Sequence, residues 1–227
     1  MNLLAALTEK PWEPSGIPQS QFLGREHTRR AGLKVLLTVV SVLFFLFIVA
    51  FLMRSQYPDW QPLAEQPNQP LFNKNQLWLN TLSLILASVF LQVARVSMRR
   101  NHPGFSQLGL ILGGLFSCAF VAGQFVFWQH LYQQGFVINV NPALSFFYLL
   151  TGLHAVHVVI GLLAWLAAVF FAIGSKTEFN QVRLKHYVDL CAMYWHFLLA
   201  LWGILFVLLV SKPDTYKAIA EFCGLGV

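Results

Sequence analysis

Residues 143–173 read ALSFFYLLTGLHAVHVVIGLLAWLAAVFFAI, a run without a single acidic residue, lysine or arginine. The hydrocarbon core of a bilayer is crossed by about 20 helical residues, so this run is long and apolar enough to span a membrane. If it is wholly helical, it measures about 45 Å. We therefore expect a transmembrane helix that tilts or extends beyond the hydrocarbon.

Four further apolar runs occur along the chain, and together the five predict an all-α fold. Charged residues make up only 11% of the chain and hydrophobic residues 57%, whereas soluble domains carry roughly 25% charged residues. A chain so poor in charge cannot cover a water-facing surface, so lipid must solvate part of it. We expect an integral membrane bundle of five transmembrane helices, at about 33–53, 77–98, 108–131, 143–173 and 188–210.

Two short tails flank this membrane domain, which we place at residues 33–210. Residues 1–32 are rich in proline and charge and lack a sustained apolar core, so we expect a cytoplasmic tail and no cleavable signal peptide. Residues 211–227 form the carboxyl-terminal tail. The cysteines Cys118, Cys191 and Cys223 lie far apart without a C-x-x-C pair, which indicates neither a disulfide nor a zinc site.

The basic residues predict the orientation of the chain. The net charge of +6 comes from short clusters between apolar runs, which is typical of cytoplasmic membrane loops rather than of a surface that binds nucleic acid. One side of the membrane collects Lys10, Arg25, Arg29, Arg30, Lys34, Arg95, Arg99, Arg100, Lys176, Arg183 and Lys185, and the other only Arg54, Lys74, Lys212 and Lys217. Because lysine and arginine are enriched in cytoplasmic loops, eleven basic residues on one side against four on the other predict that the amino terminus lies in the cytoplasm. With five spans, the carboxyl terminus then lies outside.

Few ionisable residues lie within the expected spans, and each is a functional candidate because charge is costly in lipid. His154 and His157 are three residues apart and share a helix face, and His196 follows Asp189 by seven residues on one side of the last span. The three histidines could bind haem or a metal ion. Alternatively, they donate hydrogen bonds between helices or to lipid headgroups. We favour packing, because two histidines at this spacing on one helix cannot clamp a macrocycle between them.

Asp189 allows two interpretations of its own. It could relay protons near the cytoplasmic end of its span, or it could pair with Arg183, Lys185 or His186 just upstream. We favour pairing, since an isolated carboxylate at that depth would neutralise itself.

Small and aromatic residues predict packing features rather than chemistry. Glycines allow close approach of helices in the third and fourth spans, and tryptophans near the expected interfaces anchor helices. The glycines are Gly109, Gly113, Gly114, Gly123, Gly152 and Gly161, and the tryptophans are Trp78, Trp128 and Trp195.

Three stretches resemble the cytochrome c oxidase subunit III family. FFYLLTGLHAVHVVIGLLAW (Phe146–Trp165) is similar to its penultimate helix, with the signature T-G-x-H-x-x-H-V-x-x-G that includes Gly161. VDLCAMYWHFLLALWGILF (Val188–Phe206) resembles its last helix, with Asp189 where a glutamate is usual. WLNTLSLILASVFLQVA (Trp78–Ala94) is similar to its middle helix. The resemblance covers about residues 33–210, and the family-motif residues are His154, His157, Gly161, Asp189, Tyr194, Trp195 and His196.

The chain departs from many family members in two respects. It looks like the last five of seven helices, a form found among bacterial members, so the pair that forms one wall of the family's lipid-filled cleft is missing. Many relatives carry an intramembrane glutamate in S-E-V-x-x-F in the first of these five spans. This chain has VVSVLFFLF with Ser41 at about that position, so no proton role of such a carboxylate carries over.

The resemblance implies a non-redox, catalytically silent accessory subunit of a bacterial haem–copper terminal oxidase in the inner membrane. Such a complex reduces oxygen to water and pumps protons. Haem and copper would belong to the partner subunits I and II, and none to this chain. The chain would hold phospholipid, stabilise subunit I, support proton uptake and oxygen access, and could enter a respiratory supercomplex.

Other functions stay open from the sequence. Within the family, the chain could serve a quinol oxidase or a nitric oxide reductase. It could instead be a haem-binding electron-transfer subunit that uses the histidines. A small transporter is a further possibility, although the internal repeat and broken helices of such proteins are not evident.

The basic asymmetry generates a prediction of topology. Reporter domains fused to the two ends should report the amino terminus in the cytoplasm and the carboxyl terminus outside, because loops rich in lysine and arginine stay inside. A carboxyl-terminal fusion that reports the cytoplasm would contradict the five-span arrangement.

Overall fold

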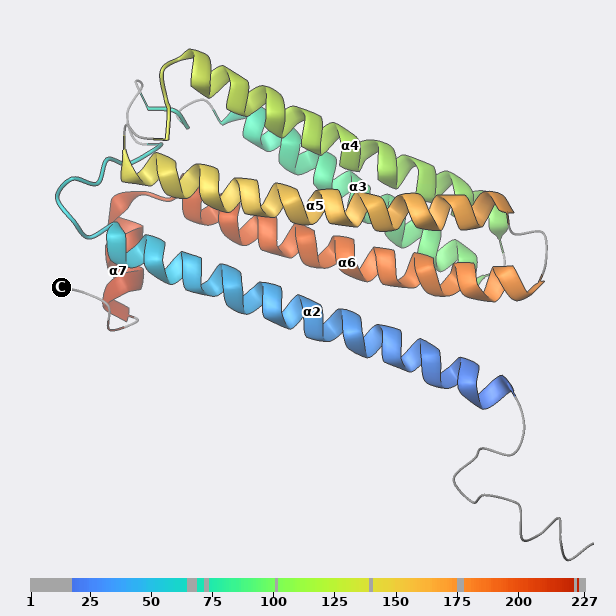
Figure 1. Ribbon diagram of the computed structural model, residues 1–227. Helices are drawn as coiled ribbons and strands as arrows, with labels where there is room; N and C mark the ends of the chain where they lie inside the picture. The colour runs from blue at the N-terminus through green and yellow to red at the C-terminus, as the bar shows by residue number, and fades with distance from the viewer. Residues whose placement is uncertain are drawn as a thin grey trace, which may run out of the picture. The chain divides into compact units, whose positions relative to one another are not determined.

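The computed structural model describes residues 18–64, 69–71, 74–100, 102–138, 141–174, 178–222 and 224 (Figure 1). The chain divides into two compact units, Met1–Leu36 and Leu37–Val227. The described part of the first unit is the beginning of one long helix. The second unit contains the remainder of that helix and all the others. Of the residues that entered the sequence predictions, Lys10, Lys176 and Cys223 lie outside the described residues.

Six helices and no strand are present in the described part of the chain. They are α2 (Pro18–Arg54), α3 (Asn75–Arg99), α4 (Pro103–Gln133), α5 (Pro142–Gly174), α6 (Glu178–Val210) and α7 (Pro213–Phe222). Five of them contain stretches long and apolar enough to cross a membrane, which confirms the predicted five-span bundle. These stretches are Thr28–Arg54, Asn75–Arg99, Gly104–Gln133, Pro142–Phe170 and Leu184–Val210.

Both predicted tails contain helix that hydropathy did not indicate. α2 begins at Pro18, well before the apolar run, and α7 occupies Pro213–Phe222. Proline fits the first helical turn because the amide hydrogen that it lacks would be unpaired there. α4, α5 and α7 each begin with a proline for the same reason. Charged and polar helices of this kind are invisible to a search for apolar runs.

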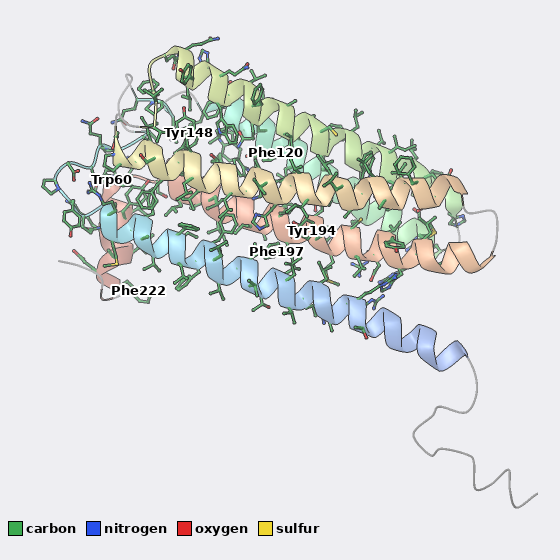
Figure 2. All side chains as sticks on the ribbon, in the orientation of Figure 1. Trp60, Phe120, Tyr148, Tyr194, Phe197 and Phe222 are labelled. Carbon is green, nitrogen blue, oxygen red and sulfur yellow. The ribbon has the colours of Figure 1, made fainter. Side chains whose placement is uncertain are left out.

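Within the second unit, consecutive spans run antiparallel (Figure 1). The last residues of α3 and α5 and the first residues of α4 and α6 therefore lie at one end, which we call the Arg99 end. The connections α4–α5 and α6–α7 lie at the other, which we call the α7 end. α3 packs most closely on α4 and also on α6, and α5 packs on both α6 and α4. Figure 2 shows the side chains, Phe120 and Tyr194 among them, that occupy the space between these helices.

Glycine permits the closest approach of α3 and α4. A Cβ atom on Gly109 would lie 2.8 Å from the carbonyl oxygen of Phe90 and 2.9 Å from the amide nitrogen of Ala94. At Gly123 it would lie 2.2 Å from the side-chain oxygen of Asn80. Gly109 therefore lets two backbones touch, as expected of small residues in membrane helices.

Glycine also makes room for large rings around α5. The indole of Trp165, on α5, covers Gly114 on α4, and a Cβ atom added to Gly114 would lie 2.0 Å from that ring. The indole N–H donates a hydrogen bond to the carbonyl of Leu110 at 2.8 Å. The prediction of close approach is wrong for Gly152, where a Cβ atom would meet nothing within 4 Å.

An aromatic cluster organises the α7 end of the second unit. The ring of Phe51 on α2 makes edge contacts with Trp60 (4.9 Å), Tyr216 (5.3 Å) and Phe146 (5.8 Å). Tyr216 on α7 also donates a hydrogen bond to the carbonyl of Leu208 at 2.8 Å. Burial raises the pKa of the Tyr216 hydroxyl, so this donor keeps its proton and holds α7 against the end of α6.

The glycine contacts lead to a paired prediction. Gly109→Ala should lower the melting temperature of the purified chain in detergent, because backbone atoms on α3 cannot move aside cheaply. Overpacking of this kind typically costs about 1–3 kcal/mol. Gly152→Ala is the matched control and should cause no loss, since its methyl group enters open space. Equal melting temperatures for the two variants would contradict the close α3–α4 contact.

Candidate functional site

A line of polar side chains joins α3 to α6 between the Arg99 end and the middle of the bundle. Ser88, Gln92, Arg95 and Arg99 are spaced by four, three and four residues, so they share one face of α3. They face Asp189 and His196 on α6. We call these six residues the α3–α6 polar seam. It contains two of the family-motif residues and is the main concentration of hydrogen-bonded ionisable groups between described helices.

Asp189 is paired with two arginines from another helix. Its Oδ1 accepts from Arg95 Nε and, at 2.7 Å, from an Arg99 guanidinium nitrogen. Asp189 is buried, Arg95 is partly buried and Arg99 reaches the surface. The expectation that Asp189 is paired is therefore met, by two residues that lie 94 and 90 positions away in the chain. Pairing with Arg183, Lys185 or His186 stays a prediction, and the side chain of Arg183 lies outside the described residues.

His196 is held by both of its ring nitrogens. Nδ1 lies 2.5 Å from Ser88 Oγ, and Nε2 lies 3.1 Å from Gln92 Oε1. A neutral imidazole has one donor and one acceptor nitrogen. Because Gln92 Oε1 can only accept, Nε2 carries the proton in this arrangement and Nδ1 accepts from the serine hydroxyl. His196 therefore ties α6 to α3 and has no nitrogen left for a metal ion.

His157 bonds within its own helix and packs against α2. Its Nδ1 donates to the carbonyl of Leu153 at 2.7 Å, and its ring meets the edge of Phe44 at 5.6 Å. The backbone carbonyl of His157 accepts from the Tyr194 hydroxyl on α6 at 2.9 Å. Both motif residues thus serve the α5–α6 contact and the packing of α2 residues in the second unit.

His154 lies in an aromatic environment at the centre of the bundle. Its ring is fully buried, 5.2 Å from the ring of Trp202 and 5.9 Å from that of Phe120. Neither ring nitrogen has a hydrogen-bond partner among the described residues. His154 shares a helix with His157, but within the described residues no hydrogen bond joins it to His157 or His196.

Trp195 is a core residue, so the prediction that it anchors the helix at an interface is wrong. Its side chain is fully buried, and its indole nitrogen donates to Ser117 Oγ on α4 at 2.7 Å. A Cβ atom on Gly161 would lie 2.9 Å from the Trp195 ring. The helix begins at Glu178, earlier than expected, so Trp195 lies in its middle.

The first span contains no substitute for the family's glutamate. Ser41 is exposed, and its hydroxyl donates to the carbonyl of Leu37 one turn earlier at 2.8 Å. Ser41 is therefore a surface residue of α2, and its hydroxyl is hydrogen-bonded within that helix.

The motif residues do not converge on one site. No group of three histidine, cysteine, aspartate or glutamate side chains within the described ranges could hold a metal ion. The described free cysteines, Cys118 and Cys191, are respectively exposed and buried. The arrangement of these side chains holds the helices in register through hydrogen bonds and through the ion cluster of Asp189, Arg95 and Arg99.

Sequence reasoning missed the α3 half of the seam. The count of basic residues assigns Arg95 and Arg99 to a loop, and hydropathy alone does not single out Ser88 or Gln92. Their spacing was a usable signal, because polar residues at four, three and four positions within an apolar run mark a face that avoids lipid.

The seam generates a prediction of stability. Asp189→Asn should lower the melting temperature of the purified chain more than Arg99→Gln does, because it leaves the partly buried Arg95 without a carboxylate. Removing one partner of a buried pair costs up to about 3–5 kcal/mol, whereas exposed pairs contribute about 0–1 kcal/mol. Asp189→Glu, which keeps the charge, is the control and should recover most of the loss. Equal effects of the two neutralising changes would contradict a buried cluster centred on Asp189.

Comparison with known proteins agrees with the arrangement of spans and motifs. A family model described as cytochrome c oxidase subunit III matches residues 7–211. The chain is 29% identical over 187 residues to cytochrome c oxidase subunit 3 of Synechocystis sp., covering 82% of this chain and 76% of that protein. It is 30% identical over 183 residues to the same subunit of Thermostichus vulcanus, covering 80% and 86%. Quinol oxidase subunit 3 of Bacillus subtilis is 26% identical over 136 residues, covering 60% and 65%. The chain belongs to the cytochrome c oxidase subunit III family.

Proposed function

We propose that this chain is the accessory, non-redox subunit III of a bacterial haem–copper terminal oxidase. Its partners are subunits I and II, which hold the haem and copper, and the assembled complex reduces oxygen to water and pumps protons. The chain spans the inner membrane, stabilises subunit I, supports proton uptake and oxygen access, and binds phospholipid. The family and the names of the similar proteins support the oxidase assignment.

One observation carries the accessory role. Asp189 and His196, the ionisable motif residues of α6, are already bonded to four side chains of α3. A residue that relays protons or binds a cofactor needs a free site for its ligand, and His196 has neither nitrogen to spare. These residues therefore support a role in holding the bundle together.

The lipid-facing surface suits contact with subunit I and with acyl chains. Large apolar side chains are exposed along the part of α3 beside the seam, and a surface of this kind is unfavourable in water. They are Trp78, Leu79, Leu82, Ile85, Val89 and Val93. With the amino terminus in the cytoplasm, the Arg99 end and its basic residues face the cytoplasmic side, where proton uptake would begin.

A quinol oxidase is the second candidate, favoured by the similarity to the Bacillus subtilis protein. The residues of this chain do not discriminate between the two electron donors, because oxidation of the donor belongs to the partners. Turnover of the purified complex with cytochrome c and with a quinol separates the two. The haem-binding alternative finds less support, since His154, His157 and His196 contact different neighbours.

The accessory role predicts the spectra of the subunit. The chain purified free of its partners should show no haem Soret band and no stoichiometric copper. A Soret band that is lost on His154→Ala or His157→Ala would contradict the proposal and favour electron transfer through a haem in this chain.

The same role predicts how histidine substitutions act in the complex. His196→Ala should lower the ratio of this chain to subunit I in the purified oxidase and leave its haem spectra unchanged. The effect should be mild, because interhelical hydrogen bonds in membranes average about 0.6 kcal/mol. Substituting His157 and His196 together should be worse than either alone. His130→Ala is the control, since His130 is exposed at the end of α4. A normal ratio with lost turnover per haem would contradict the structural role.

A further inference from the structure

One side of α3 is exposed beside the seam, and its residues recur at alternating intervals of four and three. They are Trp78, Leu82, Ile85, Val89, Gln92, Val96 and Arg99, each of them exposed or half-buried. α6 shows the same alternation in Met193, His196, Ala200, Gly203 and Val207, which are also exposed or half-buried. Gln92 and His196, one from each stripe, are hydrogen-bonded to each other, so the two stripes adjoin. We call them together the outer α3–α6 face.

The spacing and the small residues of the outer α3–α6 face suit a further helix. Alternation of four and three is the spacing at which one helix packs its side chains between those of another. Ala200 is exposed, and a Cβ atom added to Gly203 would meet nothing within 4 Å. Small residues of this kind let another helix approach closely in a membrane.

The outer α3–α6 face also contains a hydrogen-bond donor without a partner. Gln92 Oε1 accepts from His196, but Gln92 Nε2 is not bonded to any described residue. It is also not among the unpaired atoms that the packing encloses, so it reaches the surface of the bundle. A molecule on this face must therefore offer it an acceptor.

The depth of Gln92 excludes acyl chains as the source of that acceptor. The 25 residues of α3 are about 37 Å long, whereas the hydrocarbon core is about 30 Å thick. Gln92 lies about 10 Å from Arg99, the last residue of the helix. Even if the whole difference in length falls at the Arg99 end, Gln92 lies within the hydrocarbon, where lipid tails have no hydrogen-bonding group. A polar side chain of a protein helix can supply one.

The neighbouring charges specify the acceptor. Arg95, one turn from Gln92, and Arg99 share the carboxylate of Asp189, so these three side chains hold one positive charge in excess. The side chain of Arg95 is 22% exposed and that of Arg99 is 60% exposed, so both reach the surface. A carboxylate on a neighbouring helix would accept from Gln92 Nε2 and offset this excess. A second copy of this chain suits the face less well, because a symmetrical contact would bring two such cations together.

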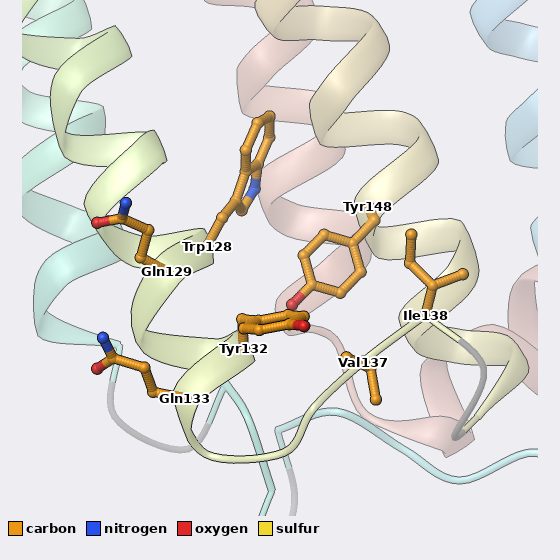
Figure 3. A pocket seen from close by; sticks show the side chains of 7 residues that line it. All are labelled: Trp128, Gln129, Tyr132, Gln133, Val137, Ile138 and Tyr148. Atoms are coloured by element: carbon orange, nitrogen blue, oxygen red, sulfur yellow. The ribbon is translucent and has the colours of Figure 1, made fainter.

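The pocket at the α7 end does not specify an occupant in this way. Its volume is about 780 Å³, and Figure 3 shows the rings of Trp128, Tyr132 and Tyr148 gathered beside it. These residues belong to the last turns of one span and the first turns of the next. At this level, the membrane–water interface, water and headgroups supply hydrogen-bond partners. Polar groups there need no protein neighbour, whereas Gln92 does.

We propose that the outer α3–α6 face docks one transmembrane helix of another polypeptide, which places a carboxylate against Gln92 Nε2 and near Arg95. The apolar residues of both stripes pack against that helix, and Gly203 lies where it approaches most closely. The docking rests on the proposed function only in that the purified oxidase supplies the partner. Family membership specifies neither this face nor this chemical group.

A photocrosslink tests the docking in the intact complex. A benzophenone amino acid replaces Val89, which is 50% exposed, and the adducts formed on irradiation of membranes are identified by mass spectrometry. The expected adduct joins position 89 to a transmembrane segment of another polypeptide, with an aspartate or glutamate within one helical turn of the linked residue. Adducts with lipid alone, with a second copy of this chain or with a segment that lacks an acidic residue would each overturn the proposal.

A bulky side chain at Gly203 should block the docking. Gly203→Leu should lower the yield of the crosslink from position 89 by about tenfold, because the added side chain occupies the place of the partner helix. Gly152→Leu is the matched control, since a Cβ atom there also meets nothing within 4 Å but Gly152 belongs to α5. The two variants of the purified chain should melt at the same temperature. An undiminished yield with Gly203→Leu would contradict the docking.

An exchange of charge tests the acceptor. Gln92→Glu keeps an oxygen for His196 but sets a negative charge against the partner's carboxylate, so retention of the partner in the purified complex should fall by about tenfold. Replacing the crosslinked acid by its amide in the same complex should restore retention, because the donor and the acceptor are then exchanged. Normal retention with Gln92→Glu alone, or no recovery on the exchange, would overturn the proposed contact.

The oxidase function and the docking face can fail separately. If the copurifying polypeptides hold no haem or copper, the oxidase function fails, whereas a crosslink from position 89 to an acidic helix still supports the docking face. If the complex is a haem–copper oxidase and position 89 links only to lipid, the docking face fails and the oxidase function stands.

Discussion

Hydrocarbon offers no hydrogen-bond partner, so polar groups inside this bundle are stabilised when another helix, or their own, supplies one. That constraint organises the second unit. Asp189 joins Arg95, His196 joins Gln92, Trp195 joins Ser117 and Trp202 joins Thr81. Asn80 joins Gln124 in the same way, at 2.8 Å. Each bond is modest alone, but together they specify one rotation and one height for α3, α4 and α6 relative to one another, because a helix that turned or slid would expose several polar groups to lipid.

The same constraint limits what the chain can do chemically. An imidazole that is bonded through both nitrogens, as His196 is, has no nitrogen left for a substrate or a metal ion. His154 differs, since aromatic rings rather than polar groups surround it. Under the proposed function, a chain of this kind would influence an oxidase through the helices that it holds in place.

The two ends of the bundle differ in chemistry. The Arg99 end carries the ion cluster and exposed Arg99 and Arg100, which suits a phosphate-rich surface and its negative potential. The α7 end is aromatic, with Phe51 in contact with three other rings. The first end therefore presents charge at its surface, whereas the second is held together by contacts between rings.

The sequence by itself determined the number of spans, the fold class and the family, because each rests on average hydropathy or on residues within one helix. Only the tertiary structure decided which residues meet: that Asp189 faces Arg95, that His196 faces Ser88, and that Trp195 is central. The physical reason is that lipid and protein interior are about equally apolar. The positions of a membrane helix that face inward therefore carry little amphipathic signal. The rotation of each helix is decided by polar partners and glycine contacts from distant parts of the chain, as Gly109 against Phe90 illustrates and open Gly152 does not.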